Sequence, residues 1–109
     1  GELYDMRKFY QEFINGIIIH AFRAYLYKDY LNEENLKIHM EKLINNPLVT
    51  TGIKYYRRKS KSDSVFIPLA IRIRNIELLK LSLKLRTKRY LKNNERKEYV
   101  ASIYRTQGE

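Results

Sequence analysis

The residues of this sequence best suited to chemistry are cations that lie beside aromatic rings in one short run. Five positive charges and two tyrosines fall within eight consecutive positions: Lys54, Tyr55, Tyr56, Arg57, Arg58, Lys59, Ser60 and Lys61. Lysine and arginine neutralise phosphates, and aromatic rings stack on unpaired bases. The run therefore predicts a nucleic-acid-binding site. The alternative interpretation is a solvated basic loop without a ligand.

A second basic series follows, and its spacing matters if the segment is helical. Its members are Arg72, Arg74, Lys80, Lys84, Arg86, Lys88, Arg89 and Lys92. On a helix, Lys80, Lys84 and Lys88 share one face at four-residue spacing, where like charges repel one another. An anionic ligand over this face relieves the repulsion, so the three lysines are a second candidate nucleic-acid contact. A solvated face is again the alternative.

Charge is distributed unevenly along the 109 residues. Residues 1–52 carry six Lys or Arg and seven Asp or Glu, a net charge of −1, whereas residues 53–109 carry sixteen and five, a net charge of +11. The whole formal charge of +10 therefore belongs to the second half of the chain. Such an asymmetry indicates an anionic partner, most often nucleic acid, although an acidic protein fits it nearly as well.

Residues for catalysis or metal binding are sparse. No carboxylate pair shares a metal-ligand spacing with either of the two histidines, His20 and His39. His20 falls near the apolar stripe of a predicted helix, which indicates a packed core histidine. The four glycines are scattered and the chain has no cysteine, so there is no phosphate-binding glycine loop and no thiol nucleophile. We therefore expect a protein that is not an enzyme and has no cofactor and no metal.

The same composition bears on location. A chain without cysteine fits a reducing compartment. The longest unbroken apolar run is Ile17–Ile19, far short of the roughly 20 residues that a membrane span needs, and charged residues interrupt the first apolar stretch where a signal peptide would be continuous. The expectation is an intracellular protein, in the cytoplasm or the nucleus, with no membrane partner.

The first secondary-structure element that the sequence predicts is a long helix. Apolar residues recur every three or four positions from Leu3 to Tyr27, which predicts one amphipathic helix of about 25 residues. Its apolar stripe is wider than one contact requires in so small a chain. Met6, Phe13 and Ile17 are therefore predicted to lie in an interface with a second copy or another protein.

A second helix and an irregular segment are predicted next. Asn32 is a potential N-cap, and Asn45-Asn46-Pro47 ends the helix because the residue before proline avoids the helical region. The helical signal then disappears. The β-forming residues from Val49 to Tyr56 and the polar residues 57–64 fit an exposed strand and turn, or an ordered loop.

Residues 65–91 fit two patterns. Alternating apolar residues allow two antiparallel strands, whereas Leu-, Lys- and Arg-rich composition and the position of Pro68 favour a helix from about Leu69 to Tyr90. A last helix is expected from Leu91 to Tyr104, capped by Asn93 or Asn94. The predicted fold is mainly α: a single small domain, alone or within a longer protein, of about four helices with a short irregular or β-hairpin-like segment near residues 48–66.

Two adjoining segments, Ile71–Arg86 and Leu91–Tyr99, resemble the late helices of GINS subunits. In that family an arginine-rich helix precedes a helix that starts with Leu, Glu and an aromatic residue at four-residue spacing, and Leu91, Glu95 and Tyr99 occupy those places here. The first half of the chain is similar only in being helical, and the small β domain of GINS subunits is absent. The resemblance implies a non-enzymatic scaffold of the replicative helicase, whose family partners are sister subunits, the MCM motor and a nuclease-like companion.

The combined prediction is a non-catalytic basic domain that binds or scaffolds in a nucleic-acid setting, with a GINS-like role in DNA replication. The first alternative is a direct DNA- or RNA-binding protein of viral or chromosomal type, in which the basic run and the Lys80, Lys84 and Lys88 face are the site itself. A third class is an inhibitor or adaptor for an acidic protein. A scaffold needs a large exposed apolar face, whereas an autonomous binder buries it.

Overall fold

The structure is a computed structural model that describes the backbone of residues 2–27 and 33–107 and the side chains of residues 5–27, 34–98 and 101–103. These residues form five α-helices and one short 3-10 helix, and they contain no strand. Helix accounts for 84% of the structure, so the predicted mainly α class is confirmed. The predicted N-cap, Asn32, lies outside the described residues.

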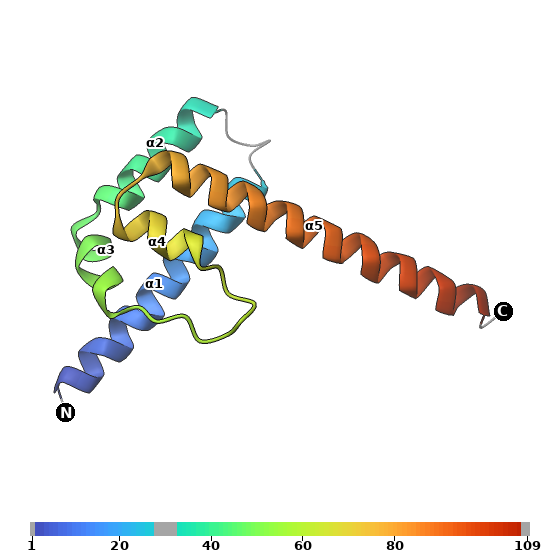
Figure 1. Ribbon diagram of the computed structural model, residues 1–109, viewed down its shortest axis with the longest axis horizontal. Coiled ribbons are helices and arrows are strands. Elements are labelled where there is room, and N and C mark those ends of the chain that lie inside the picture. Colours follow the sequence, from blue (N-terminus) through green and yellow to red (C-terminus); the bar gives the residue numbers. More distant parts are fainter. Residues whose placement is uncertain (1, 28–32, 108–109) are drawn as a thin grey trace.

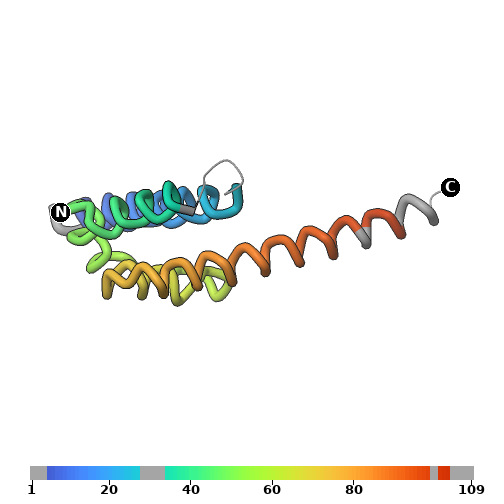
Figure 2. Tube along the Cα trace, turned by 90° about the horizontal axis from the view of Figure 1, so that it is seen from above, coloured from blue at the N-terminus to red at the C-terminus, as the bar shows by residue number. Residues whose placement is uncertain are grey.

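The helices are arranged in two layers (Figures 1 and 2). Helices α1 (Glu2–Leu26) and α2 (Glu33–Asn45), the two helices that the sequence predicted first, form one layer. Helices α4 (Phe66–Arg72) and α5 (Ile76–Gln107) form the other and run antiparallel to each other. The short helices α3 (Pro47–Gly52) and η2 (Ile53–Tyr55) connect the layers.

The hydrophobic core lies between these layers, and each of the four helices α1, α2, α4 and α5 contributes one stripe to it. Fully buried side chains come from all of them: Ile14 and Ala21 of α1, Met40 and Ile44 of α2, Ile67, Ala70 and Ile71 of α4, and Leu79 and Leu83 of α5. The second half of α5 extends away from the core (Figure 2). No helix among the described residues has the length and apolarity that a membrane span requires.

The prediction of a strand after Asn46 is wrong, because helix-starting signals outweigh β propensity there. The Asn46 side chain accepts a hydrogen bond from the Leu48 amide at 2.9 Å, and Pro47 occupies the first helical turn with its φ preset for a helix. Gly52 then allows close packing: a Cβ at this position would lie 2.8 Å from Cδ1 of Tyr10. Only residues 56–65 are irregular, so no β-hairpin forms.

The predicted helix from Leu69 to Tyr90 is helical rather than a hairpin, but it is broken into two. Arg74 has a φ of 55°, and its amide and that of Asn75 hydrogen-bond to the carbonyls of Ile71 and Ala70. These bonds form a Schellman motif that ends α4. The Asn75 side chain then accepts from the Leu78 amide at 3.0 Å and starts α5. The apolar period gave no sign of this turn, because it continues across it.

The predicted boundary before a last helix is also wrong, since α5 runs without interruption from Ile76 to Gln107. Asn93 and Asn94 are interior helical residues, not caps. An interior Asn costs only about 0.7 kcal/mol relative to Ala, which the Leu-, Lys-, Arg- and Glu-rich neighbours outweigh. Leu91 and Glu95, which resemble a GINS helix start, therefore lie in the middle of a helix.

Candidate nucleic-acid interface

The basic run at residues 54–61 is held against α1 by a pair of hydrogen bonds between Gln11 and Arg57. The Gln11 side-chain amide donates to the Arg57 carbonyl and its oxygen accepts from the Arg57 amide, both at 2.8 Å. Tyr56 has extended backbone geometry, with φ −74° and ψ 135°. The run therefore leaves η2 as a short extended segment whose backbone is fixed to a side chain 46 residues earlier.

The two tyrosines of the run do not share one role. Tyr56 is only 5% exposed and belongs to the core, and burial, with Asp63 nearby, raises the pKa of its phenol. This burial argues against its predicted role in stacking on bases, because only 5% of the residue is exposed. Tyr55 is half-buried and stacks on Tyr10, with ring centroids 5.3 Å apart and planes 9° from parallel. One face of the Tyr55 ring is thus already covered.

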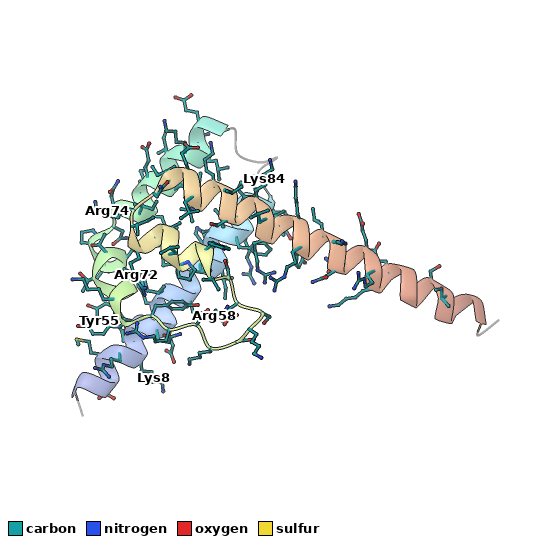
Figure 3. All side chains as sticks on the ribbon, in the orientation of Figure 1. Lys8, Tyr55, Arg58, Arg72, Arg74 and Lys84 are labelled. Carbon is teal, nitrogen blue, oxygen red and sulfur yellow. The ribbon has the colours of Figure 1, made fainter. Side chains whose placement is uncertain are left out.

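Cations from two distant segments meet on the α1 side of the run. A hollow of about 380 Å³ is lined by Arg7, Lys8, Gln11, Glu12, Tyr55, Arg57 and Lys59. A smaller adjoining hollow adds Lys54 to Arg7, Tyr55 and Arg57. We call the five cations of these hollows the α1–loop basic surface: Arg7, Lys8, Lys54, Arg57 and Lys59. Glu12 is the one carboxylate in the lining. Figure 3 places Lys8 and Tyr55 near one another at this end of the molecule.

Sequence reasoning missed Arg7 and Lys8 as site residues. They lie on the polar side of a helix that was analysed only for its apolar stripe, and no local pattern links them to residues 54–59. The link is the Gln11–Arg57 pair, which periodicity does not detect. The Arg57 guanidinium also donates to the carbonyls of Lys54 and Tyr56, at 3.2 and 2.9 Å. It therefore stabilises the backbone conformation of the segment and also gives the segment a positive charge.

Arg58 and Lys61 belong to the other side of the run, facing α4 and α5. Arg58 lines a groove with Val65, Leu69 and Arg72, and a second groove that it shares with Lys61. The loop beyond is closed by a turn in which Asp63 accepts from the Ser60 amide at 3.1 Å. Arg89 of α5 donates to the Ser62 carbonyl at 2.9 Å and holds this turn to the helix. One basic run in the sequence therefore supplies two surfaces.

The predicted lysine face lies apart from both. Lys80 is half-buried, and Lys84 and Lys88 are exposed on α5. Arg86, which faces the loop, is two residues from both Lys84 and Lys88. Two residues correspond to about 200° around a helix, so Arg86 lies on nearly the opposite side of α5 from these lysines. In Figure 3 Lys84 is on the upper side of α5 and Arg58 lies below the helix. The two predicted basic patches do not merge.

The predicted protein interface on α1 divides as well. Met6 is exposed, beside a Phe9 that is also exposed, whereas Phe13 and Ile17 are half-buried and pack against the core. Phe9 and Phe13 stack with centroids 6.1 Å apart. Met6 and Phe9 are the parts of this stripe that a partner can reach.

The two histidines come together although they are distant in sequence. Their ring centroids are 5.2 Å apart, and His20 is exposed, so the prediction that it packs in the core is wrong. Burial, then the charges of His20 and Lys42, lower the pKa of His39. Among the described residues, no group of three or more His, Cys, Asp or Glu side chains is placed to hold a metal ion.

Comparisons of the chain with protein-family models, with curated proteins and with solved structures gave no match. Function is therefore argued from the surfaces themselves.

Proposed function

We propose that this chain is a non-catalytic scaffold domain that contacts nucleic-acid phosphates through the α1–loop basic surface and holds a protein on a separate apolar face. The observation that carries the proposal is the convergence of five cations from α1 and residues 54–59 around one pair of hollows that contain a single carboxylate. Because Gln11 fixes the backbone of the segment, less conformational entropy is lost when a phosphate backbone is bound.

The scaffold half of the proposal is supported by large apolar side chains left in solvent. We call them the α4–α5 apolar face: Val65, Phe66, Leu69, Ile73, Leu81 and Leu85, each 38–56% exposed. An autonomous nucleic-acid binder of this size gains stability by burying such residues. A direct DNA- or RNA-binding protein, the second candidate, is favoured by the α1–loop basic surface alone and leaves this face unexplained.

A role in DNA replication, as a GINS-like helicase scaffold, is the proposed setting. It is supported by the resemblance of residues 71–99 to the late helices of GINS subunits. The end of α4, the turn at Arg74 and most of α5 make up this stretch. The helix start expected at Leu91 is not found, so the support comes from the arginine- and leucine-rich half of the stretch.

The nucleic-acid half is tested by titrating labelled DNA and RNA oligonucleotides over a range of salt concentrations. If all five cations contact phosphates, the log–log slope of affinity against salt is roughly −4.5 on duplex and −3.5 on single strands. Replacing Arg7, Lys8 and Lys59 with Ala removes three contacts, so we expect weaker binding to every sequence and a slope flatter by about 2–3.

The matched control removes the same charge elsewhere, by replacing Lys80, Lys84 and Lys88 with Ala. If this control weakens binding as much as the first triple variant does, the effect is one of overall charge. If it weakens binding more, the site lies on the lysine face of α5. Either outcome contradicts the α1–loop basic surface as the phosphate site.

A further inference from the structure

Helix α4 keeps one apolar side in solvent although the helix is only 7 residues long. Phe66, Leu69 and Ile73 follow one another at three- and four-residue spacing and so project from the same side. Their exposed fractions are 56%, 38% and 54%. The adjoining side of α4 is used by the fold, since Ile67, Ala70 and Ile71 are buried in the core. The helix is therefore apolar on two sides, of which the fold buries one.

Helix α5 extends this apolar side into a surface. Leu81 and Leu85 are spaced four residues apart and are each 52% exposed. Because α4 and α5 run antiparallel (Figure 1), residues near the start of α4 lie beside the second and third turns of α5. Phe66 and Leu85 line the same groove, of about 280 Å³. Scattered apolar residues are normal on a protein surface, but a contiguous group indicates an interaction site.

The surface is grooved rather than flat. A larger groove of about 650 Å³ runs between α4 and the basic run, and Val65, Pro68 and Leu69 form its apolar wall. Val65 and Arg58 line both grooves, so the two hollows adjoin. Grooves of this kind accept the side chains of one face of an amphipathic helix, which projects apolar residues at three- and four-residue spacing.

Cations surround these grooves. The larger one is lined by Arg58 and Arg72 and also by Lys54 and Arg57, which belong to the α1–loop basic surface as well. The smaller one is lined by Arg58, Lys61, Arg86 and Arg89. The one carboxylate in their lining, Asp63, already accepts a hydrogen bond from the Ser60 amide. Arg86 lies 5.1 Å over the Phe22 ring and Arg89 bonds to Ser62, so these two are also held by the fold. The border of the apolar face is thus positively charged.

We propose that the α4–α5 apolar face docks an amphipathic helix of a partner protein whose polar flanks are acidic. The apolar stripe of that helix covers Phe66, Leu69 and Leu85, and its Asp or Glu side chains meet the cations of the grooves. Charge complementarity of this kind selects the partner and speeds its association. This inference rests on the scaffold half of the proposed function, and its apolar contacts, Phe66, Leu69 and Leu85, lie outside the hollows of the α1–loop basic surface.

Other occupants fit the surface less well. A second copy in a two-fold contact brings Arg58 and Arg72 close to their own equivalents, in a chain with a net charge of +10, and like charges across an interface disfavour association. Phosphates gain nothing from Leu69, Ile73, Leu81 or Leu85, since these side chains donate no hydrogen bond. A bilayer surface is broad, so it fills two separate grooves poorly.

The test uses four synthetic peptides of about 18 residues, or roughly five helical turns, with the whole 109-residue chain. Three share one Leu stripe and carry Glu, Gln or Lys on the polar side, and the fourth is a scrambled version of the Glu peptide. We expect the Glu peptide to bind at least about tenfold more tightly than the Lys peptide, with the Gln peptide between them, and the scrambled peptide not to bind.

Variants of the chain locate the site. Replacing Phe66 or Leu69 with Ala is expected to weaken the Glu peptide about tenfold or more, as for a central interface residue. Tyr27→Ala is the matched control, because Tyr27 is 57% exposed, almost as Phe66 is, but lies just after the end of α1. Arg58→Ala with Arg72→Ala should reduce the preference for Glu over Lys. Circular dichroism and thermal melting check that each variant is folded.

Several results would overturn the inference: no binding of the Glu peptide, equal binding of the three peptides that share the Leu stripe, or equal effects of the Phe66 and Tyr27 substitutions. Phe66→Ala is also measured against a single-stranded oligonucleotide and against anionic lipid vesicles. If Phe66→Ala weakens binding of the oligonucleotide or of the vesicles but not of the Glu peptide, the α4–α5 apolar face binds nucleic acid or a membrane instead. Unchanged oligonucleotide binding in the Arg7, Lys8 and Lys59 variant would contradict the phosphate site but leave this inference untouched, so the two failures are distinguishable.

Discussion

The two sides of the basic run differ in what surrounds the same kind of charge. On the α1 side, Arg7, Lys8 and Lys59 meet polar neighbours and a half-covered tyrosine. On the α4–α5 side, Arg58 and Lys61 border leucine, valine and phenylalanine. A cation among polar groups suits a phosphate backbone, whereas a cation beside apolar side chains suits the acidic flank of a protein helix. We therefore expect the neighbours, and not the charge, to decide which ligand each side binds.

Tyr56 supports both sides, so its removal should have the largest effect. The side chain is 5% exposed and lies in the core at the point where the run leaves η2. Tyr56→Ala is expected to destabilise the protein by about 3–5 kcal/mol, as for other large-to-small aromatic substitutions in cores, and to weaken both ligands together. Chemical denaturation measures the first effect. Tyr56→Phe, which keeps the ring, is the control, and equal losses in both variants would contradict a packing role.

Gly52 supports the α1 side specifically. A Cβ there would lie 2.8 Å from Cδ1 of Tyr10 and 3.3 Å from two Ile14 side-chain atoms, close to the Tyr10–Tyr55 stack. Gly52→Ala should therefore cost about 1–3 kcal/mol through overpacking and should weaken oligonucleotide binding more than peptide docking. The control is Gly16→Ala, since nothing lies within 4 Å of its added Cβ. That change should stabilise α1 by about 1 kcal/mol, and destabilisation of both variants alike would refute the packing argument.

Replacing Gln11 should have a smaller effect on stability and should affect only the α1 side of the run. Gln11→Ala removes both hydrogen bonds to the Arg57 backbone and should cost about 1–2 kcal/mol. Because the segment then loses its fixed position beside α1, we expect weaker oligonucleotide binding with unchanged docking of the Glu peptide. Anisotropy titrations of both ligands on one variant make the measurement. Parallel losses of both affinities would show that the two sides are not separable.

The histidine pair should give the smallest effect, and one that does not distinguish the two sides. Burial lowers the pKa of His39, so this side chain binds fewer protons in the folded protein than in the unfolded chain. Stability is therefore full above the unfolded pKa of 6.5 and falls as the pH drops from there toward the lowered folded value. Thermal melts across this range measure the loss. His20→Gln removes one of the charges that lower the pKa, so it should make the loss smaller; an unchanged profile would argue against coupling of the rings.

The sequence was sufficient wherever one local pattern decided the structure. The three- and four-residue period placed α1 and α2, and residue type favoured helix over hairpin after Phe66. It was insufficient where a single side chain decided, as with the Asn46 cap of α3 and the left-handed Arg74 that separates α4 from α5.

The site was predictable only in part for a similar reason. The basic run was visible as a cluster, but its division into two surfaces depends on which residues the fold places against each side. Arg7 lies beside Arg57 because Gln11, one helical turn after Arg7, hydrogen-bonds to the Arg57 backbone 46 residues away. Tyr56 looked like its neighbour in sequence and differs from it only in burial. Such long-range contacts leave no trace in spacing or composition.

Helix α5 has a consequence of its own. It has 32 residues and is therefore about 48 Å long, yet Leu83 is the last of its described residues to be buried. A helix without tertiary contacts is marginal in water at about 12–15 residues. Backbone amides should therefore exchange with deuterium slowly near Leu83 and progressively faster toward residues 91–98. We therefore expect the outer part of α5 to behave as a helix–coil equilibrium attached to a folded domain, and slowed exchange there would report any partner that covers it.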